Sequence, residues 1–475
     1  MMNAADQALR DGRPGHAIVA YEQLLAIDPN RPDAWFNRAW AERAERRFSE
    51  ALASYRAAIE AGITRPQEAH LNRAAILSDH LFRSEEAAAE LRSALRIDPD
   101  FIPAWLSLGT IHEDLGHVDE ACRVYRTVLE LDRLNGRAHS RLAAIAILRG
   151  DAPGAAERVR LALPGARTVA DRADMLFALG TALDACGDFD DAFQAIEAAN
   201  WCAWSMASGR YDAGAERLLV DRLIATFDSA PVIARNGDDQ SPVFVCGMFR
   251  SGSTLAEQML ARHSAVIAGG ELEGVPAITR GINPYPEAVP LLSAGALATL
   301  RGAYLRESAA IGEGLITDKR CDNYVHIGLI KTLFPAARII HTVRHPLDML
   351  LSAWFLNFGD AVRWSHDLGE AARHYAEYHR LMAHWRTLWP DDIHDVSYDR
   401  MVSDPRGEMG CLLDWLGLPW EEACLGDAPI EASVRTASTW AVRQPLSTRS
   451  SGRWRNYERH LVGVRETLNA HGVAI

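Results

Sequence analysis

Apolar and polar positions alternate with a long period over the first 200 residues. A small residue followed four places later by a larger apolar or aromatic one recurs at intervals of 34, 36, 34, 34 and 37 residues. A spacing of four puts both side chains on one face of a helix, with the small residue free for a close helix crossing. The pattern therefore predicts a series of packed amphipathic helices. Its pairs are Ala17/Tyr21, Ala51/Tyr55, Ala87/Leu91, Ala121/Tyr125, Ala155/Val159 and Ala192/Ile196.

A second register between these pairs marks a partner helix in each unit. Helix stops such as Asp28-Pro29 and Asp98-Pro99 separate the units. Two helices per unit and a period near 34 residues resemble tetratricopeptide repeats, in about five and a half units. Such arrays bind a peptide, a protein partner or a neighbouring domain along a concave face; a helical platform packed on the second domain is the alternative. The second register consists of Ala34-Trp35, Ala69-His70, Ala104-Trp105 and Ala138-His139.

After residue 240 the pattern changes to alternating strands and helices. This alternation predicts an α/β domain with a mostly parallel sheet, which binds ligands at the carboxyl ends of its strands. We therefore divide the chain into a repeat domain at 1–200, a helical linker at 201–240 and an α/β domain at 241–475. The expected strands are Val243–Cys246, Val266–Ala268, Gly314–Thr317, Arg338–Val343 and Ile393–Tyr398, and the expected helices include Thr254–His263 and Pro346–Phe358.

Composition narrows the class of protein. The net charge of −13 over 475 residues is spread over both halves of the chain, which argues against nucleic acid or an anionic membrane as partner. The 7 cysteines are scattered and form no CxxC pair, a usage typical of reduced thiols, and no residues have metal-ligand spacing. The first residues lack the apolar core of a signal peptide, and no apolar run approaches a membrane span. We expect a cytoplasmic protein without a metal site.

The stretch GMFRSGST, Gly247–Thr254, follows the first expected strand and nearly matches the phosphate loop GxxxxGK[ST]. Such a loop points backbone N–H groups at an anion at the start of a helix. Kinases and ATPases need its lysine, together with Mg²⁺, to neutralise a triphosphate. Here Ser253 replaces that lysine, and the strand RIIHTV leads to Arg344 where a metal-binding aspartate is expected. The loop predicts a smaller terminal group held without metal.

A second anion-binding element begins where that strand ends. Arg344 follows the strand, and Ser352 lies eight residues later, two turns into the next helix. An arginine and a serine so placed can hold a phosphate through charge-assisted hydrogen bonds.

Together these motifs resemble the bacterial tetratricopeptide-repeat sulfotransferases, which are related to protein-tyrosine sulfotransferases. The resemblance extends from Pro242 to Tyr457 in the family's order. It implies an α-helical repeat solenoid followed by an α/β, P-loop-like sulfotransferase domain, with 3′-phosphoadenosine 5′-phosphosulfate (PAPS) as co-substrate. The element VRHPLDMLLS, with Arg344 and Ser352, then binds the 3′-phosphate. The loop FRSGSTL holds the 5′-phosphosulfate through Arg250, Ser251, Gly252, Ser253 and Thr254.

The resemblance also implies roles for residues outside the loop. A late segment, Val434–Tyr457, closes over the nucleotide with Ser438, counted among the catalytic residues, and Arg453; Tyr398 lies near the nucleotide. Glu271 is implied to be the general base for the acceptor hydroxyl, with Glu273 as the open alternative.

Lys319 is implied to support the bridging oxygen of the leaving phosphate. Lysine is rare in this chain: Lys319 and Lys331 are the only two among 50 basic residues. This rarity favours a position that requires a compact ammonium, although the pattern gives Lys331 no chemical role. Among the histidines, we interpret His341 as a hydrogen-bonded core residue and His345 as lying near the nucleotide rim.

The sequence thus predicts a PAPS-dependent sulfotransferase whose repeat domain binds the acceptor or a protein partner. The acceptor hydroxyl is open among protein tyrosine, a saccharide and a small phenol. Two other functions are considered: a P-loop kinase with a displaced lysine, and a repeat scaffold whose inactive second domain binds nucleotide structurally. The joint presence of Arg250, Glu271, Lys319, Arg344 and Ser352 argues against the scaffold.

Overall fold

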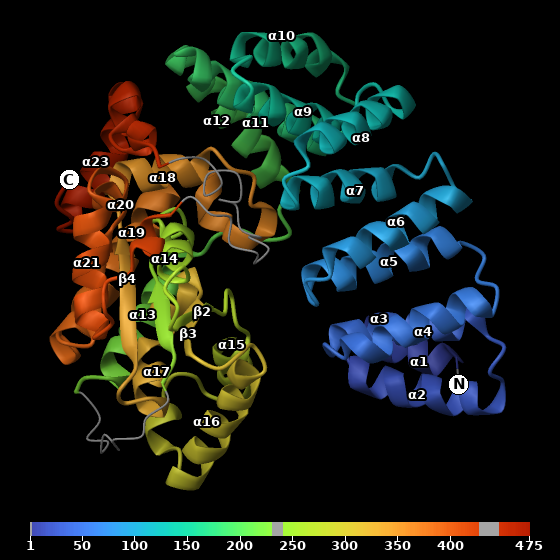
Figure 1. Cartoon of the computed structure of the whole chain (residues 1–475), viewed down its shortest axis with the longest axis horizontal. Coiled ribbons are helices and arrows are strands. Elements are labelled where there is room, and N and C mark those ends of the chain that lie inside the picture. The colour runs from blue at the N-terminus through green and yellow to red at the C-terminus, as the bar shows by residue number, and fades with distance from the viewer. Residues whose placement is uncertain (1, 230–240, 427–445) are drawn as a thin grey trace. The chain divides into compact units, whose positions relative to one another are not determined.

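The structure is a computed structural model, and it describes residues 2–229, 241–426 and 446–475. Ser438, expected in the site, lies outside the described residues. The chain divides into two compact units, Met1–Cys186 and Gly187–Ile475 (Figure 1).

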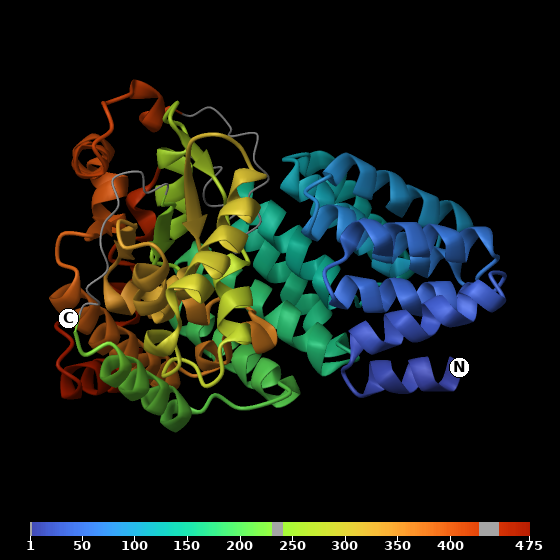
Figure 2. The same ribbon diagram turned by 90° about the horizontal axis from the view of Figure 1, so that it is seen from below.

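The first unit consists of stacked helices, as the periodicity predicts (Figures 1 and 2). The predicted small–large pairs that fall in this unit are all at most 1% exposed. Gly109 shows how closely the helices approach, since an added Cβ would lie 2.5 Å from the ring of Tyr125. The α-helices are α1 (Met2–Arg10), α2 (Pro14–Ile27), α3 (Pro32–Ala44), α4 (Phe48–Glu60), α5 (Pro66–Asp79), α6 (Ser84–Ile97), α7 (Ile102–Asp114), α8 (Val118–Leu131), α9 (Gly136–Leu148), α10 (Ala152–Ala162) and α11 (Val169–Cys186).

The second register has a local structural cause. The indole Nε1 of Trp35 donates to the carbonyl of Pro29 at 2.8 Å, and that of Trp105 donates to Pro99 at 2.8 Å. Each aromatic side chain thereby ties the first turn of its helix to the turn that precedes it. Prolines at the first helical positions of α3 and α7 begin these helices, because a missing N–H is tolerated there.

The second unit contains a five-stranded sheet of order β2-β3-β1-β4-β5, with every pair of neighbours parallel. Because β1 lies between β3 and β4, the chain order reverses beside it, and ligands of open α/β sheets bind at this position. The predicted bounds hold for β1, β2 and β4, whereas β3 extends to include Lys319 and β5 ends one residue early. The strands are β1 (Val243–Cys246), β2 (Val266–Ala268), β3 (Leu315–Lys319), β4 (Arg338–Val343) and β5 (Ile393–Ser397).

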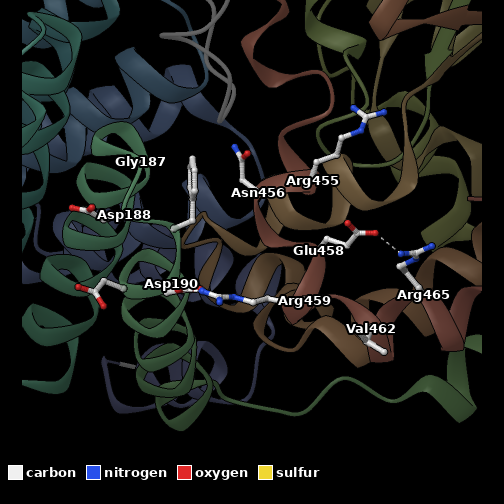
Figure 3. A pocket seen from close by; sticks show the side chains of 11 residues that line it. Gly187, Asp188, Asp190, Arg455, Asn456, Glu458, Arg459, Val462 and Arg465 are labelled. Atoms are coloured by element: carbon white, nitrogen blue, oxygen red, sulfur yellow. Dashed lines mark hydrogen bonds and ion pairs between the residues drawn. The ribbon is translucent and has the colours of Figure 1, made fainter.

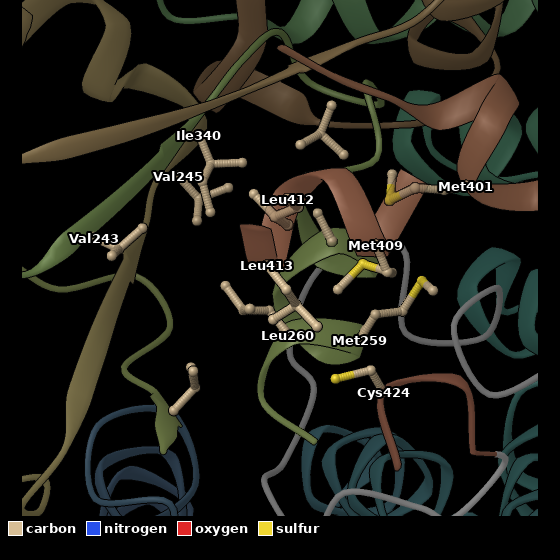
Figure 4. Close-up of a cluster of buried hydrophobic side chains, with 13 residues drawn as sticks. Val243, Val245, Met259, Leu260, Ile340, Met401, Met409, Leu412, Leu413 and Cys424 are labelled. Carbon is tan, nitrogen blue, oxygen red and sulfur yellow. The ribbon is translucent and has the colours of Figure 1, made fainter. Parts of the chain in front are cut away.

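Side chains of β1 alternate between two hydrophobic layers. Val243 and Val245 join a buried cluster with residues of α14, α20 and α21 (Figure 4). Phe244 points to the other face, where its ring lies 5.8 Å from that of Tyr304 and 6.0 Å from that of Phe334. The helices that surround the sheet are α13 (Ala213–Thr226), α14 (Ser253–Leu260), α15 (Gly274–Gly281), α16 (Ala294–Ala309), α17 (Ile327–Leu333), α18 (Pro346–Trp354), α19 (Leu368–Leu388), α20 (Tyr398–Ser403), α21 (Pro405–Leu416) and α23 (Val462–Ala470).

Helix α12 (Phe189–Met206) also lies in the second unit. The amide Nδ2 of Asn200 is buried and donates to the carbonyl of Trp354 at 2.8 Å. Helix α18 is shorter than expected: it ends at Trp354, and a 3₁₀ segment follows at Gly359–His366. Among the described residues, no helix is both long and apolar enough to cross a membrane.

Candidate functional site

The predicted phosphate loop lies at the carboxyl end of β1, where the backbone takes conformations that favour glycine. Gly247 has φ 146° and Gly252 has φ 103°. An added Cβ at Gly247 would lie 2.6 Å from the carbonyl oxygen of Thr342, and one at Gly252 would lie 2.8 Å from the ring of Tyr398. Arg250, between them, also has a positive φ of 72°. The two glycines thus allow the loop to pass close to β4 and α20.

The loop hydroxyls surround the start of α14. Gly252 caps this helix, so Ser253 and Thr254 occupy its first turn, whose N–H groups have no partners within the helix. Ser251 is fully buried, with its Oγ 2.7 Å from Oγ1 of Thr342 on β4. The Oγ of Ser253 lies 3.5 Å from the Sγ of Cys321. This arrangement can bind an anion through backbone amides and hydroxyls.

The arginines predicted to bind the donor lie together. The Nε of Arg250 donates to the Oγ of Ser352 at 3.1 Å, and Nη1 of Arg344 donates to the carbonyl of Arg250 at 3.1 Å. The guanidinium of Arg344 covers the ring of Tyr398 at 4.5 Å. Arg453 covers the ring of Phe355, just beyond α18, at 4.1 Å. The structure therefore brings Arg250, Arg344, Ser352 and Tyr398 into direct contact.

This arginine cluster is electrostatically suited to an anion. Burial, followed by the positive charge of Arg344, lowers the pKa of Arg250 to about 10. Burial also lowers the pKa of Arg344, against the opposing effect of Tyr398 and nearby aspartates. In the described part of the chain, the Nε of Arg344 is buried without a hydrogen-bond partner. A bound anion would supply that partner and offset the repulsion between the guanidinium groups.

A carboxylate that sequence reasoning missed anchors the segment carrying Arg453. Asp348 is 2% exposed, and its two oxygens accept hydrogen bonds from the backbone N–H groups of Gly452 at 2.6 Å and Trp454 at 2.7 Å. Asp348 lies midway between Arg344 and Ser352, at helical spacing from each. That spacing indicated that Asp348 lies on the same helix face as Arg344 and Ser352. It did not indicate the partners of Asp348, which lie more than a hundred residues away in sequence.

The two predicted catalytic side chains form an ion pair at the end of β3. The Nζ of Lys319 donates to Oε1 of Glu271 at 2.7 Å. The Lys319 side chain is 2% exposed, whereas that of Glu271 is 52% exposed and therefore open to solvent. Burial acts to lower the pKa of Lys319, but the carboxylates of Glu271 and Glu257 outweigh it, and the pKa is raised.

Glu273, the alternative base, has different partners. Its Oε1 lies 3.2 Å from Nη1 of Arg320, and its Oε2 lies 3.7 Å from Nη2 of Arg280. Within the described residues, the hydrogen bonds of Lys319 include Glu271 and not Glu273. The two carboxylates thus have different partners: Glu271 contacts Lys319, and Glu273 contacts Arg320 and Arg280.

The phosphate loop and the ion pair lie at the same edge of the sheet. Lys319 pairs with Val245 in the parallel register, two residues before the loop begins. The N–H of Gly247 donates to the carbonyl of Cys321 at 3.3 Å, which ties the loop to the residues after Lys319.

His341 lies in the core, as the sequence predicts. His341 is 2% exposed, and its Nδ1 lies 2.7 Å from Oδ1 of Asp395, while its Nε2 contacts the hydroxyl of Tyr378. These contacts confirm that His341 is a hydrogen-bonded core residue. The ring of His345 stacks on that of Trp454 at 5.0 Å, beside the arginine cluster.

A separate pocket of 810 Å³ lies between the start of α12 and the residues around α23 (Figure 3). Arg459 pairs with Asp190 across it, and Nη1 of Arg465 lies 2.8 Å from Oε1 of Glu458. None of the predicted site residues lines this pocket.

In the described ranges, no group of three or more histidine, cysteine, aspartate or glutamate side chains is placed to hold a metal ion.

Comparisons with known proteins match two parts of the chain to two different families. Residues 242–422 match the model of the sulfotransferase family, and residues 2–66 and 106–170 match the tetratricopeptide repeat. The chain is thus similar to the sulfotransferase family over residues 242–422 and to tetratricopeptide repeats before it, and the predicted fold class, a helical repeat array followed by an α/β domain with a parallel sheet, is confirmed.

Individual proteins similar to this chain share 18% to 32% of its sequence over the aligned regions. An uncharacterized protein of Aquifex aeolicus (strain VF5) is 32% identical over 316 residues, which cover 62% of this chain and 41% of that protein. The chain thus spans about two fifths of the length of this relative. The sulfotransferase domain from the Synechococcus PCC 7002 olefin synthase is 18% identical, covers 51% of this chain and 99% of its own, and has a TM-score of 0.38. That from the curacin biosynthetic pathway is 18% identical, covers 50% and 99%, and has a TM-score of 0.37.

Proposed function

We propose that the second unit transfers a sulfuryl group from PAPS to a hydroxyl acceptor. One observation carries this proposal: an arginine cluster and a lysine–glutamate pair border a single phosphate loop that lacks the kinase lysine. The match of residues 242–422 to the sulfotransferase family supports it.

The anionic groups of PAPS would be bound by arginine side chains, hydroxyls and backbone N–H groups. Arg344, Ser352 and Arg453 bind its 3′-phosphate, and the Nε of Arg344 donates one of the hydrogen bonds. Arg250, the hydroxyls of Ser251 and Ser253, and the first turn of α14 bind its 5′-phosphosulfate. Because this end carries less charge than a triphosphate, backbone amides and one guanidinium suffice without Mg²⁺.

PAPS supplies a sulfuryl group on a good leaving group, and the side chains of the ion pair assist its transfer. Glu271 takes the proton of the acceptor hydroxyl, whose oxygen bonds to sulfur as the bond from sulfur to the bridging oxygen breaks. The electron pair of that bond stays on the 5′-phosphate of adenosine 3′,5′-bisphosphate. Lys319 donates a hydrogen bond to the bridging oxygen while this charge develops.

The proposed acceptor is a compound with a hydroxyl group. One carboxylate base can serve a protein tyrosine, a saccharide hydroxyl or a small phenol. We propose that the repeats bind the acceptor or a protein partner, as tetratricopeptide arrays do along their concave face.

Nucleotide identity tests the proposal directly. We expect adenosine 3′,5′-bisphosphate to raise the melting temperature without Mg²⁺. At a hundred times its Kd, the ligand should increase the free energy of unfolding by about 2.7 kcal/mol. ATP with Mg²⁺ should have a much smaller effect. Thermal-shift measurements with both nucleotides decide the question: stabilisation by ATP with Mg²⁺ and none by the bisphosphate would identify a kinase-like site instead.

A further inference from the structure

Glu257 is a buried carboxylate with no part in the transfer described above. It lies on α14, one turn beyond Ser253, and is 4% exposed. Its Oε1 accepts hydrogen bonds from Oγ1 of Thr317 at 2.8 Å and from the N–H of Gly270 at 3.1 Å. Burial raises the pKa of Glu257, against the opposing charge of Lys319. Burying a carboxylate in such a position is costly unless the carboxylate is hydrogen-bonded, as that of Glu257 is.

The turn that Glu257 contacts is fixed from several sides. The N–H of Gly269 donates to the carbonyl of Thr317 at 3.0 Å, and an added Cβ on Gly269 would lie 2.2 Å from that oxygen. Gly270 has φ 64°, in the left-handed region. The carbonyl of Gly270 accepts from the backbone N–H of Lys319 at 2.7 Å. Both peptide groups of Gly270 are therefore held, one by Glu257 and one by β3.

Glu271 follows this turn, and its carboxylate returns to the Nζ of Lys319 at 2.7 Å. The contacts thus connect Glu257 through Gly270 and Glu271 to Lys319, and Thr317 on the same strand as Lys319 completes a circuit back to Glu257. Because Glu257 belongs to α14, the circuit joins the ion pair to the helix whose first turn is expected to hold the donor.

We propose that Glu257 is a positioning residue: it fixes the Gly269-Gly270 turn so that Glu271 and Lys319 keep a constant position relative to the donor loop. This role rests on the proposed sulfuryl transfer. In-line attack requires the acceptor oxygen, the sulfur and the leaving oxygen to be aligned, and a displacement of about 1 Å can lower a rate about 10²-fold. A rigid link between the base and the donor helix prevents that displacement.

The two lysines of the chain provide a readout that does not depend on activity. Selective ¹³C,¹⁵N-lysine labelling of the full chain gives two side-chain signals, one from Lys319 and one from Lys331. Glu257→Gln keeps the size of the side chain and an oxygen for the Gly270 N–H, but removes the charge. We expect this variant to lower the pKa of Lys319 in an NMR titration and to leave the Lys331 signal unchanged.

Asp392→Asn is the matched control. Asp392 is 8% exposed and its Oδ2 lies 2.9 Å from the Nζ of Lys331, so it is a buried carboxylate paired with the other lysine. This variant should change the Lys331 signal and leave that of Lys319 in place. Melting temperatures of both variants show whether the fold is retained.

Turnover is measured as release of adenosine 3′,5′-bisphosphate from PAPS, with 4-nitrophenol as probe acceptor. We expect Glu257→Gln to lower kcat about 10²-fold while bisphosphate affinity stays within about twofold. An unchanged Lys319 titration, or a kcat near wild type, would overturn the positioning role. A loss of bisphosphate affinity in step with kcat would assign Glu257 to the loop helix itself and also overturn it. If the wild type neither binds the bisphosphate nor uses PAPS, the proposed function fails, while the lysine titration still decides whether the charge of Glu257 acts on Lys319.

Discussion

The carboxyl end of β3 and the end of α17 each bury one of the two lysines, and they satisfy its ammonium group differently. Lys331, on α17, donates to the carbonyls of Pro335 at 2.6 Å and Ala337 at 3.0 Å, and to Oδ2 of Asp392 at 2.9 Å. An ammonium has three donors, and here each meets an oxygen. Lys319 is equally buried, at 2% exposed, yet in the described part of the chain its Nζ hydrogen bonds to Glu271 alone.

This difference explains why two lysines occur among 50 basic residues. Both positions require a compact ammonium, because a planar guanidinium cannot direct three donors from one atom. At Lys331 the oxygens belong to the protein, so the lysine stabilises the fold. At Lys319 the partner is half-exposed, and among the described residues the other donors of the ammonium meet no oxygen, which fits the proposed role in transfer. Five substitutions test this distinction and extend it to neighbouring residues.

Lys331→Met should have the largest effect, and it should fall on stability. The variant leaves the carboxylate of Asp392 buried without its ammonium and removes a donor from the carbonyls of Pro335 and Ala337. Breaking a buried ion pair in this way costs about 3–5 kcal/mol. Urea unfolding should show the loss, whereas turnover per folded molecule should remain at the wild-type level. A variant as stable as the wild type would contradict a structural role for Lys331.

Lys319→Arg should affect turnover instead. The positive charge is kept, but a broad planar group replaces a compact donor. Charge develops on the bridging oxygen only as the bond to sulfur breaks, so kcat should fall about 10²–10³-fold and donor affinity should change little. Transfer of labelled sulfate from PAPS is measured beside bisphosphate affinity. Unchanged kcat would remove Lys319 from the chemistry, and a parallel loss of affinity would make it a binding residue.

Arg344→Ala extends the comparison to a cation that we propose binds the 3′-phosphate of the nucleotide. Its loss should weaken adenosine 3′,5′-bisphosphate by about 1.5–3 kcal/mol, the contribution of a charge-assisted hydrogen bond, and adenosine 5′-phosphate much less. Calorimetric titration with both nucleotides gives the difference. Arg301→Ala is the control, since Arg301 lies on α16 and covers the ring of Phe334 at 5.5 Å. Equal weakening of both nucleotides would show that Arg344 serves the fold.

Much of the fold could be predicted because its signals are local. The pairs that begin with Ala17/Tyr21 lie one helical turn apart, and the bounds of Val243–Cys246 and Arg338–Val343 follow from short apolar runs between polar residues. The phosphate loop was also evident, since its glycines and hydroxyls are adjacent in sequence. Local signals predicted the end of α18 less well: four residues expected in the helix lie beyond Trp354.

The supporting contacts of the site could not be predicted, because they join residues far apart in sequence. Asp348 accepts from Gly452, 104 residues away, and Glu257 accepts from Thr317, 60 residues away. A lone aspartate or glutamate on an amphipathic helix gives no sign of such a partner. The role of Lys331 was equally hidden, because Asp392 lies 61 residues away. Only the folded chain reveals which rare lysine has its donors satisfied.

Glu273→Gln should have the smallest effect, and it decides which carboxylate acts with Lys319. Glu273 is partly exposed and its carboxylate lies near Arg320 and Arg280, a surface arrangement that contributes about 0–1 kcal/mol. We therefore expect kcat within about twofold of the wild type and a nearly unchanged melting temperature.

Glu271→Gln is the matched variant, two residues away. It removes the carboxylate 2.7 Å from Lys319 and with it the proton acceptor, so kcat should fall at least about 10²-fold. Both variants are compared at saturating PAPS with 4-nitrophenol across a range of pH, because loss of a general base also removes the acidic limb of the rate profile. If Glu273→Gln lost the limb and Glu271→Gln kept it, the base would be Glu273, and the ion pair with Lys319 would serve only to hold the turn.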